Sequence, residues 1–469
     1  MHCITPILRQ RAKRVAIVID GERITYRTLQ RDIARVAHVL QQAHYKTIAL
    51  DMPNSYDWLR TFLGAVAAGV TPYLLDSKWS MHEKQQILLH HQPDCVITEK
   101  LPLCDNDTYE LRQAPSLFVG FTSGTTGIPK GYERTHLSWI ESFRVTAEAF
   151  RLEQTRHYCA PGPLVHSMTL FAAMQALVEG KTIHLQRKFD AMGVMTLCQT
   201  YDDMALFVVP TMLEALTTTD SCATIHALIS SGAKWQNDSK ERVAKTFPNT
   251  AQYEFFGSSE ASYISYSDGT KPQTVGRFFS SVQYTIRDEA FHEVSEGFLY
   301  IKSPMIFSGY ARNKQATNAV FRNGWLAVGD IVTVDEEGYL TIKGRAKNRI
   351  ISGGLNIFPE EVEQLLAAHP AIQEVMVCGQ QDDYWGEKVV ALIQWQKEPL
   401  THEELAAYCA PYLARYKFPR DIFTVKTFYY TGSGKIARQK MKEEWLCQTS
   451  SLSGQNAPQS DALLDSSKR

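Results

Sequence analysis

The stretch FVGFTSGTTGIPKGYERTH (118–136) joins an apolar run to a lysine through residues rich in glycine and hydroxyl groups. Glycine lets a backbone approach an anion closely and turn its N–H groups toward it. Lys130 adds a positive charge beside these donors. The composition leaves two interpretations open, a phosphate-binding loop or a solvated loop between a strand and a helix. The hydroxyl-bearing residues of this stretch are Thr122, Ser123, Thr125 and Thr126, and its central glycines are Gly124 and Gly127.

Neither of the two glycine- and lysine-containing loops is a Walker A loop. That loop has the pattern G-x-x-x-x-G-K-[ST], in which a hydroxyl residue follows the lysine. After Lys130 comes a glycine, and in TGSGKIAR (431–438) an isoleucine follows the lysine. The protein is therefore not a P-loop NTPase.

Charge and cysteine usage exclude several further classes. The 469 residues carry 49 Lys+Arg and 50 Asp+Glu, a formal net charge of -1, so nothing indicates a nucleic-acid partner. The nine cysteines are odd in number and never form C-x-x-C, which favours reduced thiols over a disulfide framework or a zinc site. No apolar run reaches the length of about 18 residues that a membrane span needs. We expect a cytoplasmic protein with no membrane span.

Short strand-like runs alternate with helical patterns along the first part of the chain, which is typical of α/β architecture. The helical patterns at 56–69 and 167–180 each end in glycine, a common helix stop. The expected strands are TIALDMP (47–53), PDCVITEK (93–100), SLFVGFT (116–122), KTIHLQ (181–186) and DMALFVVP (203–210).

Two changes in the sequence pattern divide the rest of the chain. From about 281 to 343, short alternating strands with charged turns predict a small β-rich subdomain of the large N-terminal domain, 1–343. Residues 344–446 predict a compact α+β C-terminal domain with helices at 359–370 and 402–416 and strands at 374–379 and 388–395. Residues 447–469 are rich in serine and predict a disordered tail.

The segment T-S-G-T-T-G-x-P-K-G (122–131) resembles, position for position, the phosphate loop of the adenylate-forming superfamily, which includes acyl-CoA ligases, peptide-synthetase adenylation domains and beetle luciferases. Further motifs of that family recur in order between about 20 and 446. The resemblance implies that Thr122 to Gly127 and Lys130 contact the phosphates of ATP. It also implies a C-terminal domain that is hinged on the larger one.

Three motifs of the N-terminal domain are similar to family segments around the acyl group and the nucleotide. By this resemblance His166 in PLVHSMT (163–169) positions the carboxylate. In YEFFGSSEAS (253–262), Glu260 would hold Mg²⁺, as a hard oxygen ligand should. The same comparison places Gly232, Ala233, Phe256 and Gly257 beside adenine and Ser259 beside the phosphates.

The later motifs supply the ribose, hinge and thiol contacts that the resemblance implies. Asp330, at the end of NGWLAVGD (323–330), would bind the ribose hydroxyls, and Arg345 would support the nucleotide. Lys347 falls on the hinge position, and Lys435 in TGSGKIAR is the lysine that enters the active site during adenylation. The residues expected along the coenzyme A path are Ser352, Gly353 and Gly354.

Several residues depart from the family pattern. Phe256 replaces a common tyrosine, Ser259 replaces threonine, and Val328 stands where threonine is usual. Tyr429 and Tyr430 replace the usual Pro-Lys or Pro-Arg. Tyr132 takes the place of a small aliphatic residue after P-K-G, so we expect it to reshape the entrance to the acyl pocket.

The function that the resemblance implies is ATP-dependent activation of a carboxylic acid to an acyl-adenylate, followed by transfer to the thiol of coenzyme A. The resemblance implies an acyl pocket built from 166–175, 207–213 and 229–262, and the largely apolar or small side chains there favour a fatty or other apolar monocarboxylate. The alternatives are an adenylase that loads a carrier protein, an aryl- or o-succinylbenzoate-CoA ligase, and a nucleotide-binding sensor without catalysis. The oligomeric state, monomer or homodimer, is left open.

Overall fold

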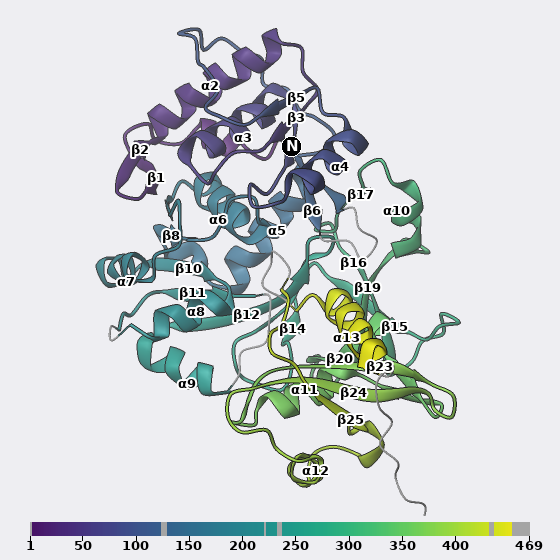
Figure 1. Ribbon diagram of the computed structural model, residues 1–469. Helices are drawn as coiled ribbons and strands as arrows, with labels where there is room; N and C mark the ends of the chain where they lie inside the picture. Colours follow the sequence, from purple (N-terminus) through teal and green to yellow (C-terminus); the bar gives the residue numbers. More distant parts are fainter. Residues whose placement is uncertain (1, 123–128, 220–221, 232–236, 431–435, 453–469) are drawn as a thin grey trace, which may run out of the picture. The chain divides into compact units, whose positions relative to one another are not determined.

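The computed structural model describes residues 2–122, 129–219, 222–231, 237–430 and 436–452, and within 237–239 and 446–452 it describes only the backbone. The chain divides into two compact units, Met1–Ala346 and Lys347–Arg469 (Figure 1). The sequence predicts this division after residue 343. Each unit is mixed α/β, as predicted for the fold class.

Among the described residues, the largest sheet of the first unit has nine strands in the order β14-β13-β12-β11-β10-β8-β9-β1-β2. From β12 to β1 in this order neighbouring strands are parallel, and antiparallel strands complete both ends. The bounds are β1 Val15–Ile19, β2 Glu22–Thr25, β8 His157–Cys159, β9 Thr182–Leu185, β10 Met204–Val208, β11 Ala227–Ser230, β12 Ala251–Ser258, β13 Ser262–Ser267 and β14 Arg277–Phe278.

The second sheet of this unit has the order β17-β7-β6-β4-β3-β5 within the described ranges. Its strands β4, β3, β5 and β6 are parallel, whereas β6, β7 and β17 are antiparallel. A third sheet, β15-β16-β19-β18 with β20 beside β19, occupies the region predicted to be β-rich. The bounds are β3 Thr47–Leu50, β4 Thr71–Leu74, β5 Cys95–Ile97, β6 Phe118–Thr122, β7 Lys130–Arg134, β15 Gln283–Arg287, β16 Glu296–Lys302, β17 Gly309–Tyr310, β18 Phe321–Arg322, β19 Trp325–Val334 and β20 Leu340–Arg345.

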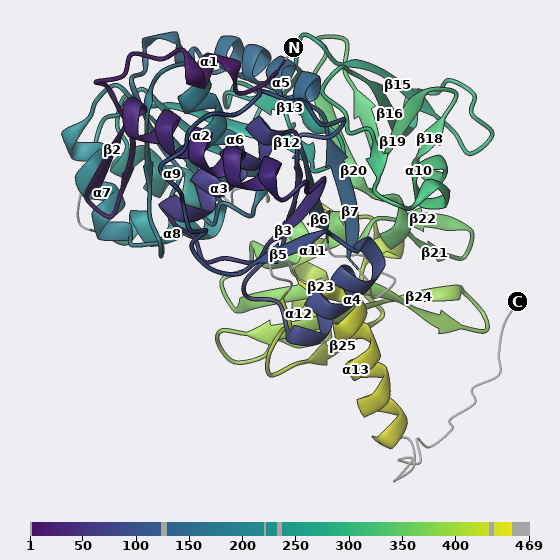
Figure 2. The ribbon, with the colours of Figure 1, turned by 90° about the horizontal axis from the view of Figure 1, so that it is seen from above.

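Helices cover both faces of the nine-stranded sheet. The helices α7, α8 and α9, which lie along β10 to β12 in Figure 1, bury apolar side chains against Leu206, Val208 and Leu228 on one face. Phe207 and Ile229 point to the opposite face, into the main core that α5 and α6 share. Figure 2 shows α2 and α3 side by side, in agreement with their close packing. The bounds are α1 Thr5–Leu8, α2 Tyr26–Gln42, α3 Tyr56–Ala68, α4 Met81–His91, α5 His136–Ala149, η1 Leu152–Gln154, α6 Ser167–Val178, α7 Ala191–Thr200, α8 Pro210–Thr217, α9 Asn237–Thr246 and α10 Lys314–Val320.

The second unit has its own sheet, in the order β22-β21-β24-β23 with β25 beside β24, and its own core. The helix predicted over 402–416 ends at Cys409, because Pro411 lacks the N–H that a continuing helix needs. The helix α13 extends six residues into the segment predicted to be a tail, so 447–452 are helical. The bounds are η2 Ala346–Asn348, β21 Ile350–Ser352, β22 Leu355–Ile357, α11 Pro359–Ala367, β23 Ile372–Asp382, β24 Gly386–Trp395, α12 His402–Cys409, η3 Arg415–Lys417, β25 Asp421–Thr424 and α13 Arg438–Leu452.

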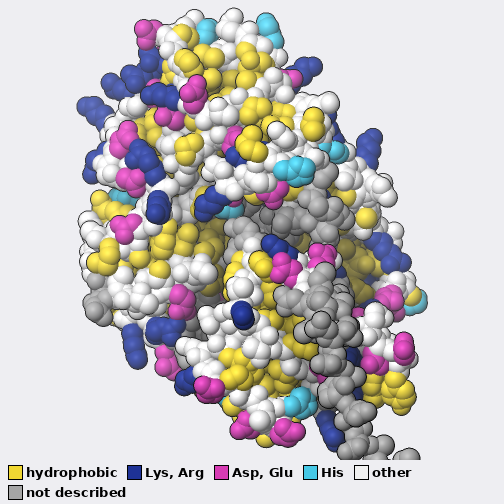
Figure 3. All heavy atoms as spheres, viewed as in Figure 1, with side chains coloured by type: hydrophobic (Ala, Val, Ile, Leu, Met, Phe, Trp, Pro, Cys, Tyr) yellow, Lys and Arg dark blue, Asp and Glu magenta, His cyan; other side chains and the backbone are white. Residues whose placement is uncertain are grey.

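The surface carries no separated charge on the face drawn in Figure 3, where cationic and anionic side chains of the described residues are interspersed. This matches the near balance of charges in the sequence. Across the described ranges, no helix is long and apolar enough to span a membrane.

Candidate active site

The segment 123–128 connects the ends of two paired antiparallel strands. Thr122, the last residue of β6, pairs with Lys130, the first residue of β7. The phosphate loop predicted from the sequence therefore follows a strand and leads into a strand, rather than into a helix. Both flanking residues are partly exposed, and the Lys130 ammonium lies 5.4 Å from the centroid of the Tyr310 ring.

Glu260 lies in the tight connection between β12 and β13. The Ser258 Oγ atom accepts a hydrogen bond of 3.0 Å from the Ala261 N–H, which closes this turn around Ser259 and Glu260. Gly257 precedes the turn at a register irregularity, and a Cβ atom there would lie 2.0 Å from the Ser262 carbonyl oxygen. Only glycine fits this position, which explains the F-G-S-S-E pattern in steric terms.

Tyr310 connects Glu260 with Lys130. Its hydroxyl donates a 2.9 Å hydrogen bond to Glu260 Oε1 while its ring faces the Lys130 ammonium. Burial raises the pKa of Tyr310, and the negative charge of Glu260 raises it further. Tyr310 therefore stays a neutral donor that holds the carboxylate in place. We call Lys130, Glu260 and Tyr310 the anion-site group.

Tyr132 is buried between the phosphate-loop strands and the start of α6. Its hydroxyl lies 2.7 Å from Ser167 Oγ, and its ring fills the space above Gly120, where a Cβ atom would be 2.3 Å from the hydroxyl. Burial raises the pKa of Tyr132, and hydrogen bonds to the Ser167 and Ser259 side chains oppose this rise. Tyr132 thus contacts two segments that carry predicted site residues, next to His166 and beside Glu260.

His166 occupies the N-cap position of α6, and its own side chain does not cap the helix. Its Nε2 atom lies 3.6 Å from the Asp76 carboxylate, which is almost fully buried. Burial lowers the pKa of His166, whereas Asp76 raises it. The net effect lowers the pKa and favours a neutral imidazole near pH 7. No motif in the sequence marks Asp76 as a neighbour of His166.

Asp330 and Arg345 are paired across β19 and β20. They face each other in register, and the Arg345 Nε atom lies 3.0 Å from Asp330 Oδ1. Arg345 also donates a 3.2 Å hydrogen bond to the Val328 carbonyl oxygen. Asp330 is buried and Arg345 is partly exposed. The structure therefore brings together the two residues predicted at the ribose.

The second unit contains the predicted hinge and thiol-path residues. Lys347 is its first residue and lies in the short turn η2. Gly353 and Gly354 connect β21 to β22 with φ angles of 57° and 79°, a conformation that glycine adopts without strain. Ser352 is buried and pairs with Gly386.

Some predicted site residues lie outside the described ranges: Ser123, Gly124, Thr125, Thr126, Gly127, Gly232, Ala233 and Lys435. Phe256, by contrast, is described and lies partly exposed on β12, next to Gly257.

The apolar segments predicted around the acyl group divide into core and surface. On α6, Leu170, Phe171 and Met174 are at most 3% exposed and belong to the main core. Met168 and Met212 are only partly buried. The predicted pocket wall is thus largely fold core, and these two methionines remain accessible.

The Glu260 carboxylate of the anion-site group is a suitable ligand for a magnesium ion. Mg²⁺ is commonly held by one or two carboxylates together with substrate phosphates. Glu260 provides a carboxylate whose Oε1 is already oriented by Tyr310. In the described part of the chain no three His, Cys, Asp or Glu side chains form a metal-binding cluster. Glu260 is accordingly the residue that would hold Mg²⁺.

Two family models match this chain. The model described as AMP-binding enzyme matches residues 7–119 and 110–311, and the AMP-binding enzyme C-terminal domain matches 361–435. The chain is 36% identical to an uncharacterized acyl-CoA ligase, YhfT, of Bacillus subtilis, with 92% of this chain and 95% of YhfT covered. It is 30% identical to a putative long chain fatty acid-CoA ligase, VraA, of Staphylococcus epidermidis, over 95% of this chain and 98% of VraA.

Solved structures share the fold over nearly the full chain. The o-succinylbenzoate CoA synthetase MenE of Bacillus subtilis, in complex with an acyl-adenylate intermediate, superimposes with a TM-score of 0.86 at 26% identity, covering 94% of this chain and 98% of MenE. A second MenE structure, which holds ATP and a magnesium ion, gives 0.85 at 26% identity and covers 94% of this chain and 99% of that one.

Proposed function

The chain belongs to the AMP-binding enzyme family, and from that premise we propose that it is an AMP-forming acid–thiol ligase. It activates a carboxylic acid with ATP, and the acyl group then passes to the thiol of coenzyme A. The products are an acyl-CoA thioester, AMP and pyrophosphate. The eight cysteines of the described ranges are free thiols, which supports a reducing, cytoplasmic location.

The observation that carries this proposal is the anion-site group beside the phosphate-loop strands. Lys130 and Glu260 are 130 residues apart in the sequence, and Tyr310 contacts both. A cation and an oriented carboxylate at the end of a glycine- and hydroxyl-rich loop suit a polyphosphate that carries a divalent cation.

In the first step a carboxylate oxygen of the acid attacks the α-phosphorus of ATP, and the bond from that phosphorus to the bridging oxygen of pyrophosphate breaks. Negative charge then grows on the leaving pyrophosphate, and the ammonium of Lys130 would stabilise this charge. Glu260 would hold Mg²⁺, which when bound neutralises phosphate charge. Asp330, paired with Arg345, binds the ribose and so aligns the nucleotide.

In the second step the coenzyme A thiolate attacks the acyl carbon, and the bond to the AMP oxygen breaks. His166, which burial keeps neutral, orients the acyl group in both steps, and the Asp76 carboxylate lies 3.6 Å from its Nε2 atom. Lys435 stabilises the first step, and rotation at Lys347 brings Ser352, Gly353 and Gly354 to the thiol for the second. These last assignments rest on the family resemblance.

We propose a fatty or other apolar monocarboxylic acid as the substrate. The partly buried Met168, near the start of α6, and Met212, on α8, support this choice as adaptable apolar side chains in the segments that the family resemblance places around the acyl group. The relative VraA is named a putative long chain fatty acid-CoA ligase, which points the same way. An aryl acid of the o-succinylbenzoate type is the second candidate, because MenE resembles this chain at 26% identity.

The test is acid-dependent release of pyrophosphate from ATP, measured with and without coenzyme A. The panel holds short, medium and long fatty acids, benzoate and o-succinylbenzoate. The proposal predicts release with an apolar acid and formation of its CoA thioester. Pyrophosphate release that coenzyme A does not accelerate would favour loading of a carrier protein. The absence of pyrophosphate release with every acid of the panel would refute the proposal that the protein is an acid–thiol ligase.

A further inference from the structure

One face of β7 carries three side chains toward the same region of the first unit. Residues two apart in a strand point to the same side, so Lys130, Tyr132 and Arg134 share this face. Lys130 is at the partly exposed end of the strand, whereas Tyr132 and Arg134 are buried. Lys130 belongs to the anion-site group, and the Tyr132 hydroxyl lies 2.7 Å from Ser167 Oγ. The third, Arg134, is a buried cation with no role in the mechanism so far.

Arg134 is only 2% exposed, and its two Nη atoms donate to main-chain oxygens, whereas its buried Nε atom has no hydrogen-bond partner among the described residues. Its Nη2 atom donates a 2.6 Å hydrogen bond to the Met305 carbonyl oxygen. Its Nη1 atom donates to the carbonyl oxygens of Ser259, at 3.3 Å, and Glu260, at 3.5 Å. None of the ion pairs between described residues includes Arg134. A buried charge held only by carbonyl groups is uncommon, because removing it from water is unfavourable.

The carbonyl groups that Arg134 binds belong to two segments that meet at Glu260. The Phe307 N–H donates a 2.7 Å hydrogen bond to the Glu260 carbonyl oxygen, so Met305 and Phe307 both fasten the turn. The same segment continues to Tyr310, whose hydroxyl holds the Glu260 carboxylate. Glu260 is therefore held at two places. Arg134 and the Phe307 N–H bind its main-chain carbonyl oxygen, and the Tyr310 hydroxyl binds its side-chain carboxylate.

The burial of Arg134 lowers its pKa to about 10, while the nearby Tyr132 and Glu260 oppose this effect. The guanidinium therefore remains protonated near neutral pH. Its planar fork reaches oxygens of two separate segments at once, which a lysine ammonium cannot reproduce in the same geometry.

We propose that Arg134 is a positioning residue that fixes the 259–260 turn, so that the Glu260 carboxylate is aligned for Mg²⁺ bound with ATP. This inference rests on the proposed function, because it assigns Arg134 to the metal-dependent part of nucleotide binding. Residues that orient a metal ligand typically change metal affinity by about 10- to 100-fold when they are replaced. Arg134 acts through Glu260 and does not itself contact the substrate.

The experiment is isothermal titration calorimetry of the full chain with ATP, once in Mg²⁺ and once in EDTA. The ratio of the two dissociation constants is the affinity gain that Mg²⁺ provides. We expect Arg134→Met to reduce this gain by about 10-fold or more, with metal-free ATP binding within about twofold of wild type.

The matched control is Arg60→Met. Arg60 is equally buried, at 2% exposure, and contacts Asp57 and the Leu101 carbonyl oxygen instead of the site. The Arg60→Met substitution should lower the melting temperature and leave the gain in ATP affinity from Mg²⁺ unchanged. A merely structural role for Arg134 predicts that both variants behave in this way, and that result would overturn the inference.

Arg134→Lys decides the matter if Arg134→Met does not melt cooperatively. The lysine keeps the charge but reaches fewer of the three carbonyl oxygens. The gain in ATP affinity that Mg²⁺ provides should therefore be smaller in Arg134→Lys than in wild type, without being lost completely. A gain equal to that of wild type would overturn the inference. If wild type itself does not bind ATP in either buffer, the proposed function fails and the role of Arg134 fails with it.

Discussion

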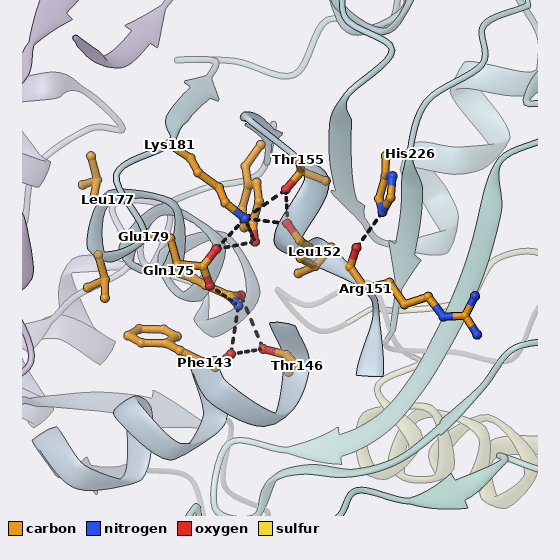
Figure 4. Close-up of polar contacts among 12 residues, drawn as sticks. Phe143, Thr146, Arg151, Leu152, Thr155, Gln175, Leu177, Glu179, Lys181 and His226 are labelled. Atoms are coloured by element: carbon orange, nitrogen blue, oxygen red, sulfur yellow. Dashed lines mark hydrogen bonds and ion pairs between the residues drawn. The ribbon is translucent and has the colours of Figure 1, made fainter. Parts of the chain in front are cut away.

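Replacement of Lys181 by methionine should destabilise the first unit and spare the chemistry. Lys181 lies in a buried polar group behind α6, shown in Figure 4. Its ammonium donates hydrogen bonds to the Leu152 carbonyl oxygen at 2.6 Å and to Thr155 Oγ1 at 3.0 Å. It also forms an ion pair of 2.6 Å with Glu179, and both side chains are largely buried. Glu179 is the C-cap of α6 and His166 is its N-cap, so the polar group around Lys181 lies at the end of α6 opposite to His166.

The magnitude follows from the groups that lose a partner. Methionine fills a similar volume, but the Glu179 carboxylate then lacks its cation, and breaking a buried ion pair costs about 3 to 5 kcal/mol. Glu179 still accepts hydrogen bonds from Tyr158 at 3.1 Å and Gln175 at 2.9 Å, so we expect the lower end, about 3 kcal/mol. An unfolding entropy of about 0.7 kcal/mol/K for a unit of this size converts that loss to a fall of about 4 °C in melting temperature.

The assay is differential scanning calorimetry of wild type, Lys181→Met and the double variant Lys181→Met, Glu179→Gln. The double variant should regain part of the lost stability, because it removes the unpaired charge. Lys271→Met, which breaks an exposed pair with Asp335 and Glu337, is the control and should shift the melting temperature much less. A shift below about 1 °C for Lys181→Met, or a double variant no more stable than Lys181→Met, would refute the reasoning.

Further predictions concern pH, packing and catalysis. The buried His136 has a pKa lowered to about 4 by burial, against about 6.5 in the unfolded chain, so the unfolding free energy should fall by up to about 1.4 kcal/mol per pH unit between pH 6.5 and 4. Urea titrations at several pH values measure this slope, which His136→Gln should reduce by the contribution of His136, while the buried His91 and His184, whose pKa values are also lowered, keep theirs. Gly120→Ala should lower soluble yield and melting temperature because its Cβ would collide with the Tyr132 ring, and it should cost less stability in a Tyr132→Ala background than in wild type; an equal cost in both backgrounds would argue against that collision. Lys435→Ala should slow ATP–pyrophosphate exchange by about 10² to 10³, and near-normal exchange would remove it from the first step. Lys347→Pro should impair exchange and thioester formation unequally, whereas equal losses would count against a hinge.

Local signals in the sequence were sufficient for the helices and strands that it predicts individually, and other elements, such as α2 and α5, were not predicted from it. The expected helix at 56–69 is α3, with Ser55 as its N-cap and Gly69 in the left-handed conformation at its end. The expected helix at 402–416 was too long, because the apolar period continues through Pro411 although the backbone cannot. Strand order could not be read from the chain, since pairings such as β1 with β9 join residues more than 160 positions apart.

The candidate site shows the same limit. Glu260, Asp330 and Lys130 stand in linear motifs and could be named from the sequence. Tyr310 is 50 residues from the carboxylate that it holds, and no local pattern marks it. Arg134 is 171 residues from Met305, and in the sequence it reads as an ordinary charged residue at the end of a strand. Contacts of this kind depend on the folded topology, and only coordinates reveal them.

The most direct test of the acyl-adenylate route follows one oxygen atom. The best acid of the panel is labelled with ¹⁸O at both carboxyl oxygens and incubated with ATP, Mg²⁺ and coenzyme A, and the nucleotide product is analysed by mass spectrometry. Because the carboxylate attacks the α-phosphorus and the thiol later attacks the acyl carbon, we predict AMP that carries one ¹⁸O and unlabelled pyrophosphate. Unlabelled AMP, or ADP as the nucleotide product, would contradict the account.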